Sequence, residues 1–232
     1  MRARSPFLAV ACLALGCSRP TAEAAPVPSP PPPVAREDRR ADLEPSGSSL
    51  MLATSIEEID AGTTTRSLAG KTVLLVGDSM VGNHGLVRAL DEKLSADGAK
   101  LVHEHKVSES VVSFDKSPRL ARLLARHDPD VVVVALGTND VFVPYPQAMA
   151  ANVRRIVARI GARECYWMGP PTWKPDTGIV AVIRDNAGPC RFFDASTLQL
   201  PRAGDGIHPT DKGGAVWAER FWEVLRGAEA SP

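Results

Sequence analysis

Residues 131–140 read VVVVALGTND, and they contain the clearest strand signal of the chain. Four valines followed by Ala135 and Leu136 form a short, unbroken apolar run. β-Branched residues favour extended backbone, and a continuous apolar run is typical of a strand buried on both faces, as in a parallel sheet. The polar GTND segment that follows has the composition of a turn. This stretch therefore predicts a parallel sheet with polar residues just after a strand.

Strand and helix signals alternate on both sides of this run. Further short apolar strands are predicted at residues 71–76, 101–107, 165–168 and 191–193. Apolar residues spaced three or four apart predict helices around residues 86–94, 120–124, 149–160, 179–183 and 217–225. Repeated strand–helix–strand units predict an α/β fold: a five-stranded parallel sheet with helices on both faces, in three α/β/α layers.

Ligands of such sheets bind beyond the carboxyl ends of the strands. The residues at these positions are Ser79, within Gly-Asp-Ser after the first strand, and Asn139, within the GTND segment. Asp205 and His208, in an Asp-x-x-His spacing, stand just before the last helix. We therefore expect one serine, one amide and one Asp–His pair to meet at a single edge of the sheet.

These residue types suit acyl transfer. A serine hydroxyl becomes a good nucleophile when an imidazole removes its proton, and a carboxylate on the other ring nitrogen orients that imidazole. The oxyanion of the tetrahedral intermediate needs preplaced hydrogen-bond donors. The backbone N–H of Ser79 and the side-chain amide of Asn139 are suitable donors, while Asp205 can turn back to His208 across a glycine-containing loop.

The motifs resemble those of the SGNH (GDSL-like) hydrolases over residues 71–226. Gly-Asp-Ser79, Gly-x-Asn139-Asp and Asp205-x-x-His208 look like three of the family's sequence blocks. The resemblance implies a flavodoxin-like fold and an esterase without metal or cofactor, with Ser79 as nucleophile, His208 as base and Asp205 as its orienting acid. It also implies a third oxyanion donor after the second strand. No glycine stands there, and Ser110 is the expected counterpart.

Several residues outside the triad are interpreted less directly. His84 stands one helical turn after Met80 if the helix begins at the Ser79 segment, so we expect it to touch the substrate. Trp173 follows the fourth strand and is expected to touch the substrate too, although packing under the proline-rich loop explains it equally well. His103 and His105 alternate on the second strand, but we find no further ligands that would make a metal site.

Two other functions stay open: acyl transfer to a sugar hydroxyl with the same triad, and a carbohydrate-binding envelope domain without catalysis.

The N-terminal quarter has a different composition. Residues 1–17 combine two arginines, an apolar run and a lipobox-like LALGC ending, which predicts a signal peptide with lipidation of Cys17. Residues 18–66 are rich in proline and predict an extended tether, residues 67–227 a hydrolase domain, and residues 228–232 a tail. We therefore expect an exported protein of the cell envelope, held by a lipid at the membrane, which would be the outer membrane in a Gram-negative cell. A periplasmic or secreted protein without the lipid is the alternative.

Charge and cysteines limit the remaining possibilities. Lys plus Arg and Asp plus Glu number 27 each, so no net positive charge attracts nucleic acid, and we expect small-molecule or carbohydrate ester substrates instead. Cys165 and Cys190 remain in the predicted domain. Each stands four residues before a residue that marks a strand end, Gly169 and Asp194 respectively, so on neighbouring parallel strands the two cysteines would lie side by side. Export permits a disulfide between them, although two free buried thiols are the alternative.

Overall fold

In the computed structural model, residues 65–227 are described, and they form a five-stranded parallel sheet with the order β2-β1-β3-β4-β5. The strands are β1 (Thr72–Gly77), β2 (Lys100–His105), β3 (Val131–Ala135), β4 (Glu164–Met168) and β5 (Arg191–Phe193). Every residue of β3 is buried, which fits its place in the middle of the sheet. The predicted five-stranded parallel sheet is confirmed.

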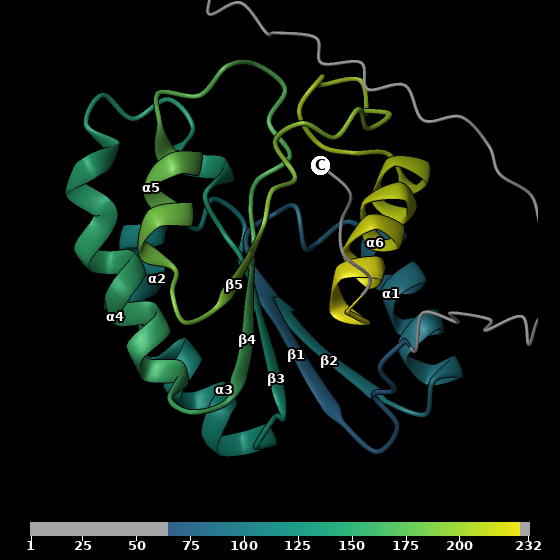
Figure 1. Cartoon of the computed structure of the whole chain (residues 1–232). Helices are drawn as coiled ribbons and strands as arrows, with labels where there is room; N and C mark the ends of the chain where they lie inside the picture. Colours follow the sequence, from purple (N-terminus) through teal and green to yellow (C-terminus); the bar gives the residue numbers. More distant parts are fainter. Residues whose placement is uncertain (1–64, 228–232) are drawn as a thin grey trace, which may run out of the picture. The chain divides into compact units, whose positions relative to one another are not determined.

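Helices cover both faces of the sheet (Figure 1). The α-helices are α1 (His84–Ala96), α2 (Val111–Lys116), α3 (Arg119–His127), α4 (Ala150–Ile160), α5 (Ile179–Asn186) and α6 (Asp211–Leu225). Two 3-10 turns, η1 (Thr138–Asp140) and η2 (Pro146–Met149), follow β3. Helices α1 and α6 bury one core against the sheet, and α2 to α5 bury the other, which completes the predicted three layers.

The segment after β2 differs from the prediction. The strand ends at His105 rather than at residue 107, and the backbone of Ser108 is left-handed, with φ 58°. The unpredicted helix α2 follows, and Ser110 opens it through a reciprocal capping box with Ser113. This chain reversal brings residues 107–110 to the carboxyl edge of the sheet instead of extending β2.

Close contact between α1 and α6 depends on glycine. A Cβ atom on Gly85 would lie 2.0 Å from the carbonyl oxygen of Asp211, and one on Gly214 would lie 2.0 Å from Oδ1 of Asn83. Both distances are shorter than any real contact, so a side chain at either position would push the helix N-termini apart. The turn before α1 and the loop before α6 therefore meet at the same edge of the sheet.

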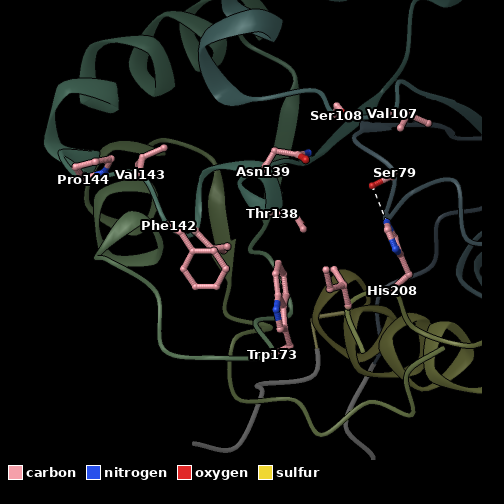
Figure 2. Close-up of a pocket in the computed structure, with 12 residues that line it drawn as sticks. Ser79, Val107, Ser108, Thr138, Asn139, Phe142, Val143, Pro144, Trp173 and His208 are labelled. Atoms are coloured by element: carbon pink, nitrogen blue, oxygen red, sulfur yellow. Dashed lines mark hydrogen bonds between the residues drawn. The ribbon is translucent and has the colours of Figure 1, made fainter. Parts of the chain in front are cut away.

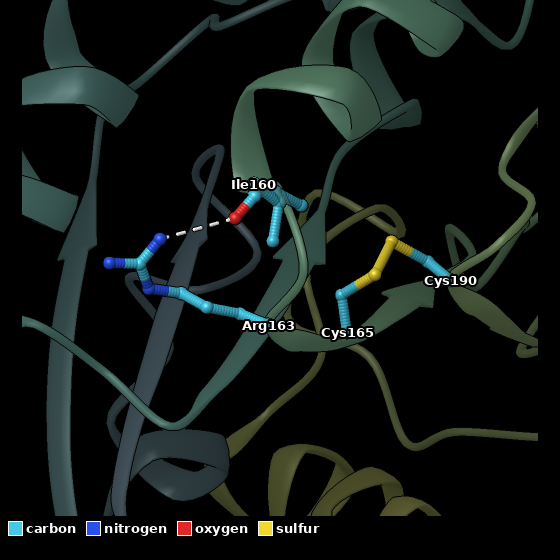
Figure 3. Close-up of a disulfide and its surroundings, with 4 residues drawn as sticks. All are labelled: Ile160, Arg163, Cys165 and Cys190. Carbon is cyan, nitrogen blue, oxygen red and sulfur yellow. Dashed lines mark hydrogen bonds between the residues drawn. A yellow bond between two sulfur atoms is a disulfide. The ribbon is translucent and has the colours of Figure 1, made fainter.

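A disulfide links Cys165 on β4 to Cys190, the residue just before β5 (Figure 3). Tyr166 pairs with Arg191 in the parallel ladder, so the two preceding residues are neighbours across the strands. Of the two possibilities that the sequence leaves open, the structure has the bonded pair.

The predicted signal peptide (residues 1–17), nearly all of the predicted tether (residues 18–66) and the tail (residues 228–232) lie outside the described residues. Their boundaries and the lipidation of Cys17 stay predictions. Arg66, at the end of the predicted tether, contacts the domain: its guanidinium pairs with Glu164 and its N–H donates to the carbonyl oxygen of Arg226. Within residues 65–227, no helix has the length and apolar character needed to span a membrane.

Candidate active site

Ser79 lies in the turn between β1 and α1. Its neighbour Asp78 is fully buried, and Oδ1 of Asp78 accepts a hydrogen bond of 2.9 Å from the N–H of Met80, which closes the turn. The side chain of Asn83 accepts from the N–H of Leu86 and caps α1. The Ser79 hydroxyl thus lies on a short turn at the carboxyl end of a buried strand, and hydrogen bonds within the turn and at the helix cap hold it in place.

His208 and Asp205 lie on the loop that leads into α6. Arg202 and Pro209 form an isolated antiparallel bridge at the base of this loop. Oδ1 of Asp205 accepts hydrogen bonds from the backbone N–H groups of Ile207, at 2.8 Å, and His208, at 3.0 Å. Oδ2 of Asp205 lies 2.7 Å from Nδ1 of the His208 ring. One carboxylate therefore both folds the loop and orients the imidazole.

The two segments meet at Ser79 and His208. Nε2 of His208 lies 2.9 Å from Oγ of Ser79, across 129 residues of sequence (Figure 2). The side chains of His208 and Asp205 are 41% and 46% exposed, so water reaches the imidazole. The structure thus brings together all three residues that the sequence predicts as a catalytic triad.

Two carboxylates near Ser79 have opposite pKa shifts. The hydrogen bonds from the His208 ring and from two backbone N–H groups lower the pKa of Asp205 to about 2, which keeps it ionised as a partner for an imidazolium. Burial raises the pKa of Asp78 to about 7, against the hydrogen bonds from Met80 and Thr138, and the nearby charge of Asp140 adds to the increase. Asp205 suits the orienting role, whereas Asp78 is a buried structural carboxyl.

Asn139 follows β3 on η1, where it is exposed and lines the same pocket as Ser79. Its Nδ2 donates one hydrogen bond of 2.9 Å to the carbonyl oxygen of Glu109. The second hydrogen of the amide remains to be donated, and in Figure 2 the amide points from its loop towards Ser79. The Glu109 carbonyl therefore fixes the orientation of Asn139.

The prediction that Ser110 supplies an oxyanion donor is wrong. The backbone N–H of Ser110 donates to Oγ of Ser113 at 2.9 Å within the capping box of α2, so it is already used. Ser108, two residues earlier, lines the pocket with Ser79 and Asn139. In residues 65–227, the backbone N–H groups of Ser79 and Ser108 find no hydrogen-bond acceptor. Ser108 is therefore a free donor after β2, as is its neighbour Val107, which also lines the pocket.

The pocket beside Ser79 has a volume of about 610 Å³. Its polar side chains, Ser79, Ser108, Thr138, Asn139 and His208, are joined by an apolar wall of Val107, Val141, Phe142, Val143, Pro144, Trp173 and Ile207. Phe142 and Trp173 meet edge to face, with ring centroids 5.6 Å apart. Trp173 thus lies in the pocket where the sequence predicts it, although its contact with a substrate stays a prediction.

His84 does not line this pocket. It is the first residue of α1 and is exposed, because residues 80–83 form a turn rather than a helical continuation of the Ser79 segment. It lines a separate cavity of about 730 Å³ with His103 and His105 of β2. The expectation that His84 touches a substrate held at Ser79 is therefore wrong. Among the described residues, no group of three or more His, Cys, Asp or Glu side chains could hold a metal ion.

Sequence reasoning did not find two residues that support the site. Nδ2 of Asn83 donates to the carbonyl oxygen of Pro209 at 2.6 Å and so ties the turn after Ser79 to the loop of His208. The guanidinium of Arg202 donates to the carbonyl oxygens of Ile207, Pro171 and Thr172. An Asn before a helix predicts a cap, but nothing in the sequence signals these backbone partners.

Comparison with known proteins agrees with the fold. The sequence profile of the GDSL-like Lipase/Acylhydrolase family matches residues 75–216, more than half of the chain. The protein therefore belongs to this family, which makes it a serine hydrolase of carboxylic esters, and the resemblance seen in the sequence is confirmed.

Individual relatives have a low sequence identity to this chain. The chain is 28% identical to esterase TesA of Pseudomonas aeruginosa over 187 residues, which are 70% of this chain and 91% of that protein. Among solved structures, it is similar to the carbohydrate acetylesterase Est24 of Sinorhizobium meliloti, with a TM-score of 0.57 and 16% identity over 68% of this chain and 99% of the other. A catalytic mutant of the acetylxylan esterase Axe2 of Geobacillus stearothermophilus gives 0.51 and 18%, over 70% and 96%. Both structures share the fold.

Proposed function

We propose that the protein is an esterase in which Ser79, His208 and Asp205 form the catalytic triad. The observation that carries the proposal is the 2.9 Å separation between Nε2 of His208 and Oγ of Ser79, together with the Asp205 carboxylate on the other ring nitrogen. This geometry suits proton transfer from the hydroxyl to the imidazole as Oγ attacks an ester carbonyl.

The reaction has two halves. Oγ of Ser79 bonds to the ester carbon while His208 takes its proton, and the tetrahedral intermediate then releases the alcohol, which recovers that proton from His208. Water, deprotonated by His208, attacks the acyl-enzyme and frees the acid and Ser79. Because His208 is partly exposed, water reaches it easily, which favours hydrolysis over acyl transfer to a second alcohol.

Three groups form the proposed oxyanion hole: the backbone N–H groups of Ser79 and Ser108 and the second side-chain hydrogen of Asn139. All three residues line one pocket. Each donor is expected to strengthen its hydrogen bond as charge develops on the carbonyl oxygen, and loss of one such donor costs about 10²–10³ in kcat.

The acyl group is proposed to occupy the apolar part of the pocket, against Phe142 and Trp173. Sugar hydroxyls would find few hydrogen-bond partners on that wall, so the alcohol part of a carbohydrate ester would extend towards solvent. Esters carried by envelope or extracellular carbohydrate are the proposed natural class. Two structural neighbours named as a carbohydrate acetylesterase and an acetylxylan esterase support this proposal, as does the predicted export.

Hydrolysis of aryl esters from acetate to octanoate by wild type and Ser79→Ala tests the proposal. We expect Ser79→Ala to lose at least about 10³-fold in kcat/KM on every ester that wild type cleaves. Equal rates in the two proteins would overturn the assignment of the nucleophile.

Export and lipid anchoring are proposed from residues 1–17 alone. Full-length protein expressed in a bacterial host is expected to incorporate a palmitate analogue and to fractionate with membranes, whereas Cys17→Ser is expected to do neither. Equal incorporation of the label into both proteins would contradict a lipid on Cys17.

A further inference from the structure

The turn that carries Ser108 has an unusual backbone. The N–H of Glu109 donates to the carbonyl oxygen of Lys106 at 3.2 Å, which closes a four-residue turn with Ser108 in its third position. Ser108 has φ 58°, a region where glycine or asparagine is usual because a Cβ atom crowds the backbone there. A serine stays in this conformation only if its surroundings hold it.

The side chain of the next residue provides such a hold. Glu109 is fully buried, and the mechanism proposed above gives it no chemical role. Its carboxylate accepts from the Arg119 guanidinium and the Ser113 hydroxyl, and Nζ of Lys106 lies 3.4 Å from it. Burial alone would raise the pKa of Glu109, but the hydrogen bonds from Ser113 and Arg119 lower it below its usual value.

Arg119 connects this carboxylate to the body of the domain. Its Nε donates to Glu104 of β2 at 2.8 Å, and its guanidinium lies over the ring of Phe114, 5.7 Å from the centroid. The arginine side chain is 11% exposed. Glu109 is thus fixed to both β2 and the start of α3, the two elements on either side of the turn and α2.

The backbone of Glu109 also reaches the other oxyanion group. Its carbonyl oxygen accepts from Nδ2 of Asn139, and this bond orients the amide. One residue therefore stands next to the strained Ser108 in sequence and in contact with Asn139 in space. Movement of Glu109 would displace two of the three proposed donors together.

We infer that Glu109, held by Arg119, is a positioning residue that fixes the Ser108 N–H and the Asn139 amide around the substrate's carbonyl oxygen. The inference rests on the proposed function. The buried ion pair replaces the conformational freedom that a glycine at position 108 would provide, and it acts on the transition state rather than on substrate binding.

The test compares kcat and KM of wild type, Glu109→Gln and Glu109→Gln with Ser108→Gly on an aryl ester, with rates normalised to active protein. Glu109→Gln is expected to lower kcat at least tenfold, with KM changed less than threefold, because the acyl pocket is untouched. Adding Ser108→Gly is expected to raise kcat of the Glu109→Gln enzyme at least threefold, since glycine adopts positive φ unaided. A folded Glu109→Gln enzyme with kcat within twofold of wild type, or one that Ser108→Gly does not improve, would overturn the inference.

Asp115→Asn is the matched control. Like Glu109, Asp115 is a buried carboxylate, and it pairs with Arg155 and Arg159. These partners belong to α4, and Asp115 does not contact Ser108 or Asn139. This variant is expected to lose stability while keeping kcat. A loss of kcat equal to that of Glu109→Gln would show that any buried charge has the same effect, and would contradict a specific positioning role.

A second variant covers the case in which Glu109→Gln fails to fold. Glu109→Gln leaves the buried guanidinium of Arg119 with Glu104 but without its carboxylate partner at position 109. Replacing both partners, with Glu109→Gln and Arg119→Gln, removes that buried charge and is less disruptive to folding. The same loss of kcat is expected, and its crystal structure should show Ser108 leaving positive φ. An unchanged Ser108 φ and Asn139–Glu109 bond would overturn the inference even if activity fell. A wild type without Ser79-dependent hydrolysis would instead refute the proposed function.

Discussion

Nδ2 of Asn83 donates a hydrogen bond of 2.6 Å to the carbonyl oxygen of Pro209. Asn83 follows the Ser79 turn, and Pro209 follows His208, so this bond joins the two segments that must meet for catalysis. Its Oδ1 accepts from Leu86 at the same time and caps α1. One side chain therefore fixes both a helix end and the spacing between the proposed nucleophile and base.

The two roles of Asn83 can be separated by mutation. Asn83→Ser keeps an N-cap acceptor but is too short to reach Pro209, so unfolding free energy should change by less than about 0.5 kcal/mol, whereas kcat should fall roughly tenfold. Asn83→Ala should show the same loss of kcat and an additional loss of about 1 kcal/mol. Urea unfolding and ester hydrolysis measure the two effects, and full activity in Asn83→Ser would refute the linking role.

Trp173 is predicted to bind the acyl group. Trp173→Ala removes the ring that meets Phe142 edge to face, so KM for a butyrate ester should rise about tenfold while kcat stays within threefold, as expected for loss of uniform binding. Trp222→Ala is the control, because an arginine lies over each ring, Arg202 over Trp173 and Arg226 over Trp222, but Trp222 is not in the pocket. His84→Ala should likewise leave KM unchanged. Equal KM values in Trp173→Ala and wild type would remove Trp173 from the binding site.

The raised pKa of Asp78 should make the free energy of unfolding depend on pH. Its pKa of about 7 in the folded state lies above the ordinary 3.8, so the native protein binds more protons between pH 4 and pH 7. The free energy of unfolding should therefore fall as pH rises through this window, by up to about 4 kcal/mol from this group, and level off above it. Asp78→Asn, which keeps the acceptor for Met80, should flatten the curve. Identical pH dependence in both proteins would contradict a neutral Asp78 at low pH.

The disulfide predicts a loss of stability on reduction. Cys165 and Cys190 are 25 residues apart, and a crosslink of this loop length stabilises by about 3.5 kcal/mol in the chain-entropy estimate. Reduction should lower Tm by about 10 °C while the reduced, still folded protein keeps its kcat at 25 °C. Calorimetry with and without a thiol reductant measures this, and an unchanged Tm would show that the bond contributes little.

Much of the fold could be predicted because its signals are local. A strand that is buried on both faces, such as β3, needs an unbroken apolar run. A helix that buries one face, such as α1, needs apolar residues three or four positions apart, which its leucines provide. Helix α2 could not be predicted in the same way, because it has six residues and too few apolar positions for a periodic pattern. It depends on the capping box of Ser110 and on packing against α4, which is a tertiary contact.

The candidate site divides along the same line. Ser79, Asn139, Asp205 and His208 could be predicted, because each residue type has the chemistry that its place after a strand or before a helix demands. Ser108 could not, since a serine gives no sign that its backbone will be left-handed. His84 was misplaced because the helix begins at residue 84 rather than at Ser79, which turns its ring to another cavity.

Covalent labelling with a fluorophosphonate, read by intact mass and peptide mapping, tests most directly whether Ser79 is the nucleophile. We predict one phosphonyl adduct per folded molecule, on Ser79, formed at the same rate as esterase activity is lost, and no adduct on Ser79→Ala. An adduct on another residue, or loss of esterase activity while Ser79 stays unlabelled, would show that Ser79 is not the nucleophile.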